Sequence, residues 1–554
     1  MLPFGRSYDE ITAAFRWRVP PAYNIAVDAC EKWAAVEPER VALIHVRADG
    51  TVDRWSYGRL SKTAHRLSNL LAARGVRRGD RVAILLPQSP ETAITHLAVY
   101  AMAAVALPLA DLFGVEALAY RLADAGAKVV VTNRAGAIKL AEIRDQLPDL
   151  ELVLTVDGIG EGAEDFHRLL AEASDRFEAV TTLAEDPALM IYTSGTTGPP
   201  KGALHAHRVL LGHLPGVQFA HEFTPQPGDL MWTPADWAWA GGLLNILLPS
   251  LALGIPVVAA RFERFDPEAV WRLIATQGIR NAFIPPTALK LLRGAGAVPM
   301  RSEIRLRTIG SGGESLGRDT YDWARAELGI TINEFYGQTE CNLVLGACAA
   351  AGVTRAGAIG KPTPGHGVAV IDDQGRIMPP GETGQIAVRR PDPVMFLGYW
   401  NNRQATAAKF IGDWMTTGDQ GMTDEDGYVF FVGRDDDLIT SAGYRIGPSE
   451  IEDCLAGHPA VALAAVVGKP DPIRTEIVKA FVKVKPGVQP DAALSDSIRS
   501  HVRNRLSAHE YPREIDFVAE IPLTTTGKVI RRFFREQARD EAAAERRAAS
   551  ETAG

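Results

Sequence analysis

Residues 52–155 alternate between short apolar segments and longer stretches with helical periodicity. Apolar segments at 81–86 and 128–132 are separated by stretches in which apolar residues recur every three to four positions. Such alternation is typical of parallel sheets that are covered by helices. Residues 255–290 repeat the pattern. We therefore predict an α/β fold whose large N-terminal domain is built on parallel sheets.

The amino-acid composition of the chain changes after about residue 355. Gly and Pro become dense, with short alternating runs such as Gln385-Ile386-Ala387-Val388, which predicts a β-rich subdomain over about 355–433. A charged break at 434–437 then precedes an α+β module. We expect a large N-terminal domain over 1–433, a hinge at 434–437 and a small mobile C-terminal domain over 438–554.

Composition also predicts the secondary structure of three other segments. Residues 1–50 are expected to be helical, with Trp17 and Trp33 as core anchors. The apolar run at 97–110 is short and contains a proline, so a buried helix explains it better than a membrane span. The last residues, from about 536, are rich in Ala, Glu and Arg and are expected to form a solvated helix.

Composition limits the classes of function. A chain of 554 residues is too long for one hydrophobic core, and its length suggests about three or four domain-sized units. The formal net charge is −8, so no basic field favours nucleic acid. The four cysteines form no Cys-x-x-Cys pair, which fits a reducing compartment. The N-terminus carries acids and lacks an apolar core, so we expect no signal peptide, no transmembrane segment and a cytoplasmic location.

The stretch 193–202, TSGTTGPPKG, follows an apolar run that is typical of a buried strand. Glycines let backbone N–H groups approach a ligand closely, hydroxyls add donors, and Lys201 adds a positive charge. This set suits a polyanion such as a triphosphate. The alternative is an ordinary surface turn, since Gly, Pro, Ser and Thr all form turns. The spacing does not match the common phosphate loop G-x-x-x-x-G-K-[ST].

The stretch 333–340, NEFYGQTE, follows a predicted strand. Tyr336 can stack on a base, Thr339 can donate to a phosphate, and Glu340 can hold a divalent cation. Magnesium takes one or two carboxylates together with phosphate oxygens, which one glutamate beside a triphosphate supplies. The alternative is a turn whose Thr or Glu caps a helix.

Three further stretches, at 417–419, 433–452 and 522–528, carry polar groups on predicted turns or loops. Read alone, they are an Asx-turn, an exposed linker and a surface loop. The carboxylate of Asp419 can accept two hydrogen bonds from a diol. A mobile ammonium such as that of Lys528 can offset the charge that develops when a carboxylate attacks a phosphate.

Together and in this order, the five stretches resemble the signature motifs of the adenylate-forming superfamily of acyl-CoA synthetases, peptide-synthetase adenylation domains and luciferases. The chain is most similar to the AMP-forming acyl-CoA synthetases of short- and medium-chain acids, and the resemblance covers nearly its whole length. It implies ATP, Mg²⁺ and coenzyme A as cofactor and co-substrates. It implies two half-reactions, in which a carboxylate attacks ATP to give acyl-AMP and the thiol of CoA then displaces AMP.

The resemblance also implies roles for individual residues. Lys528, Glu340 and Thr339 are the catalytic candidates, with Glu340 holding Mg²⁺. Lys528 is implied to act only in the first half-reaction, after which the small domain rotates about Asp436. Gly443 and Tyr444 are implied to lie at the CoA path. The nucleotide would be held by Thr193, Ser194, Gly195, Thr196, Thr197, Lys201, Gly313, Glu314, Glu334, Phe335, Tyr336, Thr339, Asp419, Arg434, Arg445 and Lys528.

The acyl pocket is implied to be lined by Trp239, Gly337, Gly312 and Cys341. Acetyl-CoA synthetases of the family place a Trp where Gly337 stands, so we expect an open pocket floor and an acid larger than acetate. Indoles at 237 and 239 would narrow the tunnel and favour short or branched acids, although Trp237 fits core packing equally well. Asn342 would place a polar group near the acyl chain, which leaves an aromatic or hydroxy acid open.

Two other functions stay open at this stage. An adenylating enzyme that loads a carrier protein would have the same motifs. A non-catalytic nucleotide-binding regulator is disfavoured, because Lys201, Glu340, Asp419 and Lys528 are all present. A lysine acetyltransferase acting on Lys528 and a second copy of the chain are further candidate partners.

Overall fold

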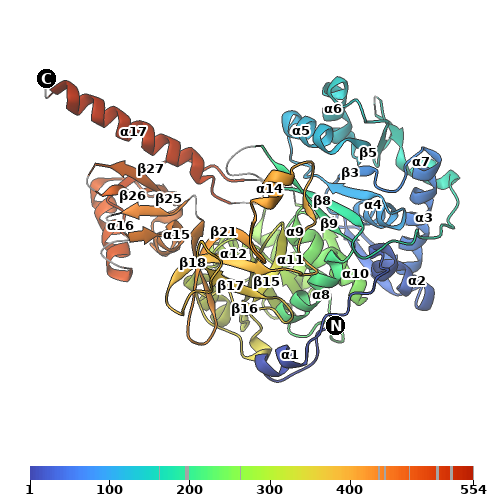
Figure 1. Ribbon diagram of the computed structural model, residues 1–554, viewed down its shortest axis with the longest axis horizontal. Coiled ribbons are helices and arrows are strands. Elements are labelled where there is room, and N and C mark those ends of the chain that lie inside the picture. Colours follow the sequence, from blue (N-terminus) through green and yellow to red (C-terminus); the bar gives the residue numbers. More distant parts are fainter. Residues whose placement is uncertain are drawn as a thin grey trace.

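Four β-sheets organise the chain in the computed structural model, which describes residues 1–160, 162–193, 199–262, 264–434, 437–441, 444–472, 474–506, 511–524 and 528–552. Figure 1 shows a large body that contains the first part of the chain and a smaller module, coloured orange to red, at one side. The architecture is mixed α/β, with a large N-terminal domain, a β subdomain and a small C-terminal domain.

The first sheet has eight strands in the order β19-β9-β8-β4-β3-β5-β6-β7. Neighbours from β8 to β7 pair in parallel, whereas β9 and β19 are antiparallel to their neighbours. Its strands are β3 (Arg81–Leu85), β4 (Val105–Pro108), β5 (Ala127–Thr132), β6 (Leu152–Thr155), β7 (Glu164–Asp165), β8 (Pro187–Thr193), β9 (Lys201–Ala206) and β19 (Gly398–Tyr399). The helices in this part of the chain are α3 (Tyr57–Ala73), α4 (Pro90–Ala101), α5 (Val115–Ala125), α6 (Arg134–Glu142), η2 (Arg144–Gln146) and α7 (Phe166–Glu172).

The second sheet has nine strands in the order β16-β15-β14-β13-β12-β10-β11-β1-β2 and is parallel from β14 to β1. Its strands are β1 (Val41–Val46), β2 (Val52–Ser56), β10 (Met231–Trp232), β11 (Val257–Ala260), β12 (Asn281–Phe283), β13 (Thr308–Gly312), β14 (Asn333–Gln338), β15 (Cys341–Gly346) and β16 (Lys361–Pro362). The helices of this region and of the N-terminal segment are α1 (Tyr8–Ala14), η1 (Val27–Glu31), α2 (Lys32–Val36), α8 (Val209–Ala220), α9 (Ala240–Gly242), η3 (Leu243–Leu247), α10 (Leu248–Leu253), α11 (Pro267–Gln277), α12 (Pro286–Gly294), α13 (Arg318–Trp323), η4 (Ala324–Leu328) and η5 (Ala349–Ala351).

Helix ends follow local capping chemistry. The side chain of Ser89 accepts a hydrogen bond from the Thr92 amide at the start of α4, and Pro90 occupies the first helical position. Asp266 caps α11 in the same way, and Gly278 ends that helix with a φ of 68°. These residues set the start of α4 and both ends of α11.

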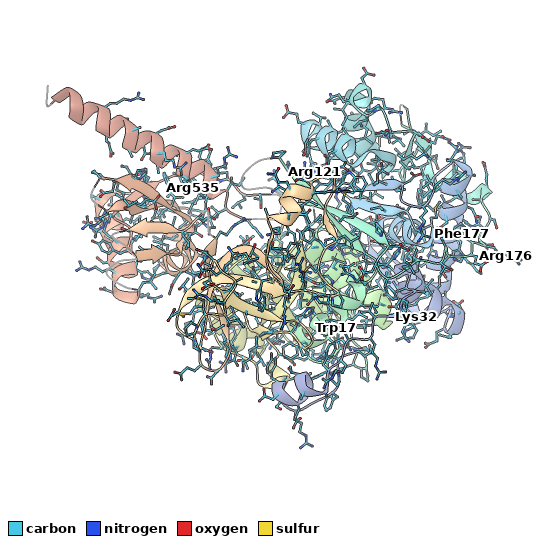
Figure 2. The ribbon with its side chains drawn as sticks, in the orientation of Figure 1. Trp17, Lys32, Arg121, Arg176, Phe177 and Arg535 are labelled. Atoms are coloured by element: carbon cyan, nitrogen blue, oxygen red, sulfur yellow. The ribbon has the colours of Figure 1, made fainter. Side chains whose placement is uncertain are left out.

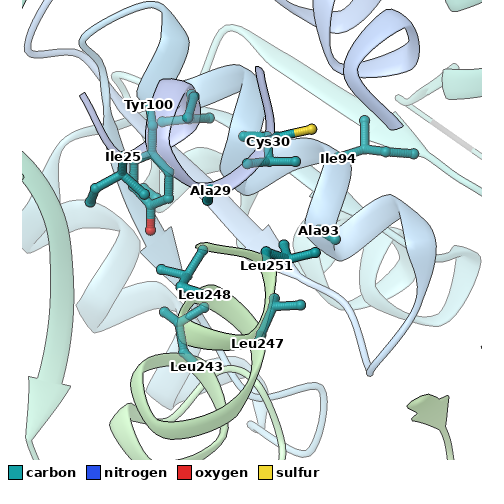
Figure 3. Packing of buried hydrophobic residues seen from close by; sticks show 14 of the residues in the cluster. Ile25, Ala29, Cys30, Ala93, Ile94, Tyr100, Leu243, Leu247, Leu248 and Leu251 are labelled. Atoms are coloured by element: carbon teal, nitrogen blue, oxygen red, sulfur yellow. The ribbon is translucent and has the colours of Figure 1, made fainter. Parts of the chain in front are cut away.

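The largest apolar core lies where helices of the two sheets meet. Figure 3 shows leucines of η3 and α10, among them Leu243, Leu247 and Leu251, packed in one cluster with Ile25 and Tyr100. All five side chains are fully buried. Burial of one such leucine stabilises the fold by about 1.5–3 kcal/mol relative to exposure, so this cluster fixes the relative position of the two sheets.

The third sheet is antiparallel and forms the β subdomain. Its strands run in the order β17-β18-β21-β20, and β22 pairs with β21. They are β17 (Val368–Ile371), β18 (Thr383–Arg389), β20 (Phe410–Ile411), β21 (Trp414–Thr423) and β22 (Val429–Arg434), with the short helix α14 (Arg403–Ala407) beside them in sequence. The prediction of a β subdomain is confirmed.

The fourth sheet belongs to the small C-terminal domain. Its strands are β23 (Ile439–Ser441), β24 (Tyr444–Ile446), β25 (Val461–Asp471), β26 (Thr475–Val484) and β27 (Glu514–Phe517), and its helices are α15 (Pro448–Ala456), α16 (Ala492–Arg505) and α17 (Arg531–Thr552). The first half of α17 is packed and not merely solvated, because Phe534 stacks on Phe481 at 4.4 Å between ring centroids. The buried amines of Lys469 and Lys479 also pair with Glu545 and Glu541 of α17.

Two predictions of secondary structure were wrong in part. Residues 1–50 are not all helical, because 41–46 form β1 between β2 and β11. The apolar run at 97–110 is not one helix, since α4 ends at Ala101 and β4 begins at Val105. In both places pairing with neighbouring strands overrides the local pattern. Trp17 and Trp33 are half-buried. None of the helices in the described ranges is both long enough and apolar enough to cross a membrane.

Candidate active site

Lys201 lies at the start of β9, opposite the end of β8. The antiparallel register places Thr193 opposite Lys201, and the Thr193 hydroxyl donates to the Lys201 carbonyl oxygen at 3.4 Å. The two strands thus bring both ends of the TSGTTGPPKG loop together. Ser194, Gly195, Thr196 and Thr197 lie outside the described residues.

Tyr399 connects the loop lysine to the glutamate that was predicted to hold magnesium. Strand β19 pairs with β9, and Lys201 Nζ lies 5.2 Å from the centroid of the Tyr399 ring. The Tyr399 hydroxyl donates to Glu340 Oε1. Glu340 is buried, and Thr339 lies beside it in the turn between β14 and β15. Sequence reasoning missed Tyr399, because no motif marks it and only the β19–β9 pairing brings it to Lys201.

Tyr336 and Asp419 meet where β14 approaches β21. The Tyr336 hydroxyl donates to Asp419 Oδ2 at 2.5 Å. Asp419 pairs in register with Arg434 of β22, whose Nε lies 4.0 Å from Asp419 Oδ1. Burial raises the pKa of Asp419, while the hydrogen bond from Tyr336 and the charge of Arg434 lower it. The aromatic ring and the carboxylate predicted to hold a nucleoside are therefore in direct contact.

Lys528 reaches the same place from the C-terminal domain. A methyl group added to Gly313 would lie 4.0 Å from Lys528 Cε, and Gly313 has a φ of 98°. The backbone amide of Lys528 donates to the Thr524 hydroxyl at 3.0 Å. The side chain keeps contact with water, yet desolvation by the surrounding protein lowers its pKa, an effect that the charges of Glu314 and Asp419 oppose.

Glu314 faces this lysine from the N-terminal domain. Its Oε2 accepts a hydrogen bond from the Thr287 hydroxyl at 2.6 Å. Burial raises the pKa of Glu314, and the charge of Lys528 lowers it. Lys528 thus lies beside Gly313 and within electrostatic reach of Glu314 and Asp419, which come from distant parts of the chain.

The side chains of Glu334 and Phe335 are turned into the protein. Glu334 is buried, its Oε1 accepts from the Leu316 amide at 3.3 Å, and burial raises its pKa to about 8. Phe335 packs against Phe283 at 5.3 Å between ring centroids. A nucleotide role for these two residues therefore rests on the backbone of β14, whereas Tyr336 presents its side chain.

Most of the predicted hinge and CoA residues belong to parts of the chain that the structure does not describe. Asp436 and Gly443 lie outside the described residues, as do the side chains of Tyr444 and Arg445. Asp437, the last residue of the charged break, is anchored to the small domain, because Arg531 Nη1 lies 3.2 Å from Asp437 Oδ2. Arg535, labelled in Figure 2 near the start of α17, also pairs with Asp437.

Comparison with known proteins decides the family. Residues 30–400 match the AMP-binding enzyme family, and residues 450–528 match the AMP-binding enzyme C-terminal domain. The mitochondrial acyl-coenzyme A synthetase ACSM2 of Rattus norvegicus is 34% identical over 528 residues, which cover 93% of this chain and 91% of the relative. The chain belongs to the AMP-forming acyl-CoA synthetase family.

Solved structures agree with this membership. The anthranilate CoA ligase AuaEII in complex with anthranoyl-AMP is 28% identical, with a TM-score of 0.86 over 95% of this chain and 99% of that chain. ATP-bound MatB from Rhodopseudomonas palustris is 29% identical, with a TM-score of 0.83 over 94% of this chain and 99% of that chain. The reaction class of this synthetase is AMP-forming ligation of an acid to a thiol.

The predicted acyl-pocket residues of the synthetase differ in their burial and in their neighbours. Trp239 is half-buried and contacts Phe113 edge-on at 5.8 Å between ring centroids. Cys341 is fully buried in an apolar cluster with residues of β9, β15 and the β subdomain, and its assignment to the acyl pocket stays a prediction. Trp237 is fully buried as well, which makes it a core residue.

Gly337 does not provide an open floor. A methyl group there would lie 2.2 Å from the Leu343 amide nitrogen and 2.7 Å from Asn342 Cα. The missing side chain therefore points at the backbone of β15, and the glycine is required by close approach of two strands. Gly312 is confined in the same way, with the Phe335 carbonyl oxygen 2.4 Å from the added methyl.

Proposed function

We propose that the enzyme ligates a short- or medium-chain carboxylic acid to coenzyme A through an acyl-AMP intermediate, with release of AMP and pyrophosphate. The single observation that carries this proposal is the position of Lys528 beside Gly313, where the charges of Glu314 and Asp419 act on it. That contact brings a cation from the C-terminal domain to the residues expected to hold the adenylate. Family membership supports the reaction class.

In the first half-reaction, Asp419 would accept hydrogen bonds from both ribose hydroxyls, and Tyr336 would pack on the base. Their mutual hydrogen bond holds each side chain in place before the nucleotide binds. Lys528 would offset the charge that develops as the acid attacks the α-phosphate. Lys201 and Thr193 would hold the leaving pyrophosphate, and Thr339 would contact the α-phosphate.

Glu340 fits a role as magnesium ligand. It is a buried carboxylate whose Oε1 accepts one hydrogen bond from Tyr399, and hard divalent cations prefer carboxylate oxygens. Magnesium bound there would offset charge on the triphosphate. The Tyr399 hydroxyl would orient the carboxylate, because groups that hydrogen-bond a metal ligand fix its direction.

For the second half-reaction, we propose rotation of the small domain about Asp436, within a hinge at 434–437. The domain over 438–554 would withdraw Lys528 from the domain over 1–433 and present Gly443 and Tyr444 to CoA. Hinged closure that builds two sites in turn is a known form of gating.

Several finer points are part of the same proposal. The unpaired cysteines support a cytoplasmic location. Acetylation of Lys528 by a lysine acetyltransferase would remove its charge and silence adenylation, and an unchanged rate after stoichiometric acetylation would refute that point. A homo-oligomer is a further proposal, to be checked by light scattering.

A carboxylate panel tests the function. Purified enzyme would be given ATP, Mg²⁺ and CoA with acids from acetate to octanoate, isobutyrate and benzoate, and AMP release would be measured. We expect CoA-dependent AMP release that is highest with an acid longer than acetate. If the enzyme adenylates the acid but forms no acyl-CoA, and instead transfers the acyl group to an added carrier protein, then the acyl acceptor is a carrier protein and not CoA. No pyrophosphate exchange with any acid would overturn the proposal.

A further inference from the structure

Three buried polar side chains form a cluster behind the β14–β15 turn. His213 of α8, Asn245 of η3 and Asn342 of β15 are 0%, 1% and 8% exposed, respectively. Asn342 Nδ2 lies 3.1 Å from His213 Nε2 and 2.5 Å from Asn245 Oδ1. Buried polar groups of this kind are costly unless each is hydrogen-bonded, so the cluster needs an explanation.

The direction of each hydrogen bond in the cluster follows from His213. Its Nδ1 lies 2.6 Å from the Val209 carbonyl oxygen, which only accepts, so the proton is on Nδ1. Burial lowers the pKa of His213 to about 4, so the ring is neutral at pH 7 and Nε2 is an acceptor. Asn342 Nδ2 must then donate to His213, and its second hydrogen goes to Asn245 Oδ1.

Two hydrogen-bonding groups of the cluster have no partner among the described residues. Asn245 Nδ2 is buried and has no partner among the described residues. Asn342 Oδ1 accepts no hydrogen bond from the described residues, whereas both hydrogens of the Asn342 amide nitrogen are used. The cluster therefore offers one free donor and one free acceptor on neighbouring amides. A hydroxyl group can accept from the first and donate to the second.

Two residues of the cluster, Asn342 and Asn245, lie near segments that the family resemblance assigns to the acyl pocket, around Cys341 and Trp239 respectively. Asn342 follows Glu340 by two positions and packs its backbone against Gly337. Asn245 is in η3, a π-helical turn that begins four residues after Trp239. Turns of this kind occur often at functional sites.

We propose that the acid carries a hydroxyl group, alcohol or phenol, at the end remote from its carboxylate, and that Asn245 Nδ2 and Asn342 Oδ1 bind this hydroxyl. This inference rests on the proposed function. All three side chains of the cluster are neutral, so a second carboxylate would be buried there without a compensating charge. The site therefore selects a hydroxy acid over both the unsubstituted acid and the dicarboxylate.

Matched acid pairs test this inference. Values of kcat/KM would be measured by AMP release for ω-hydroxy acids and their unsubstituted partners from four to eight carbons, and for 3- and 4-hydroxybenzoate against benzoate. In at least one pair we expect the hydroxy acid to be favoured at least about tenfold, because a site built to bind a hydroxyl rejects the analogue that lacks it.

The variants Asn245→Leu and Asn342→Leu should abolish that preference, mainly by lowering kcat/KM for the hydroxy acid. Ser250→Ala, which removes a buried hydroxyl on the adjacent α10, should leave the preference unchanged. If wild-type enzyme favours the unsubstituted acid in every pair, the inference is wrong even if the variants fail to fold. If no acid in the panel supports AMP release, the proposed function itself fails.

Discussion

Lys290 of α12 and Asp453 of α15 form an ion pair between the large and small domains, with Lys290 Nζ 2.9 Å from Asp453 Oδ1. The Ser315 hydroxyl donates to Asp453 Oδ2 at 2.5 Å. Burial lowers the pKa of Lys290, but the charge and hydrogen bond of Asp453 outweigh this effect and raise it. Ser315 directly follows Glu314, so these contacts hold the small domain where Lys528 meets Gly313 and Glu314.

Asp453→Asn should weaken the contacts that keep the small domain in this position. We expect adenylation, measured by pyrophosphate exchange, to fall about threefold to tenfold, in line with loss of about 1 kcal/mol from a partly exposed ion pair. Thioester formation from supplied acyl-AMP should be unchanged or faster, because it does not need this domain position. Asp496→Asn, at an exposed pair on α16, is the control. An equal fall in both half-reactions would contradict a role in domain positioning.

Tyr399→Phe keeps the ring beneath Lys201 and removes the hydroxyl that donates to Glu340. The apparent magnesium concentration required for adenylation should rise about 10- to 100-fold, as is typical when a group supporting a metal ligand is lost. Titration of magnesium at fixed ATP measures this, with Tyr321→Phe as a remote control. An unchanged magnesium requirement would show that Tyr399 does not orient Glu340.

The fold could be predicted from the sequence where an apolar pattern continues over many residues, and less well where the apolar segment is short. The alternation over 52–155 is a local property and predicted most of the parallel sheet. Strand β4 could not be separated from α4, because Val105–Pro108 are apolar in either state and only pairing with β3 and β8 decides between them.

The site residues also divide into those that a local sequence motif marks and those that only the fold brings together. Tyr336, Asp419 and Lys528 lie in motifs, so the sequence predicts them. Tyr399 and Asp453 were missed, because they act through contacts with residues about 60 to 200 positions away. Gly337 was found, but the direction in which a side chain would point depends on the neighbouring strand, so the open floor was a wrong conclusion.

Gly337→Ala should therefore damage the fold before it changes specificity. The added methyl group would collide with the β15 backbone, and such overpacking costs about 1–3 kcal/mol or more. We expect a lower melting temperature and lower activity on all acids, with their ranking preserved. Gly294→Ala, where a methyl group meets no atom within 4 Å, is the control. A stable variant with a new preference for acetate would restore the pocket-floor role.

Glu334 should make stability depend on pH. Burial raises its folded-state pKa to about 8 from the usual 4.5, so the folded protein binds the proton more tightly than the unfolded chain. The stability that this proton contributes is fully present below about pH 4.5 and is lost as pH rises to about 8. Between these two values, each rise of one pH unit should lower the free energy of unfolding by up to about 1.4 kcal/mol. Glu334→Gln mimics the protonated form.

The melting temperature of Glu334→Gln should therefore equal that of wild type near pH 5 and exceed it near pH 8. Glu382→Gln, at an exposed carboxylate, should show no such divergence. A Glu334→Gln variant that is less stable at pH 8 than wild type would mean that the carboxylate is charged and paired in the fold.

The most direct test of the proposed mechanism separates the two half-reactions in Lys528→Ala. Pyrophosphate exchange should fall by about 10² or more, as for removal of one group that stabilises developing charge. Formation of acyl-CoA from supplied acyl-AMP and CoA should continue at the wild-type rate, because in the proposed mechanism Lys528 acts only while the small domain is in the position seen here. Equal losses in the two assays would contradict the assignment of Lys528 to adenylation.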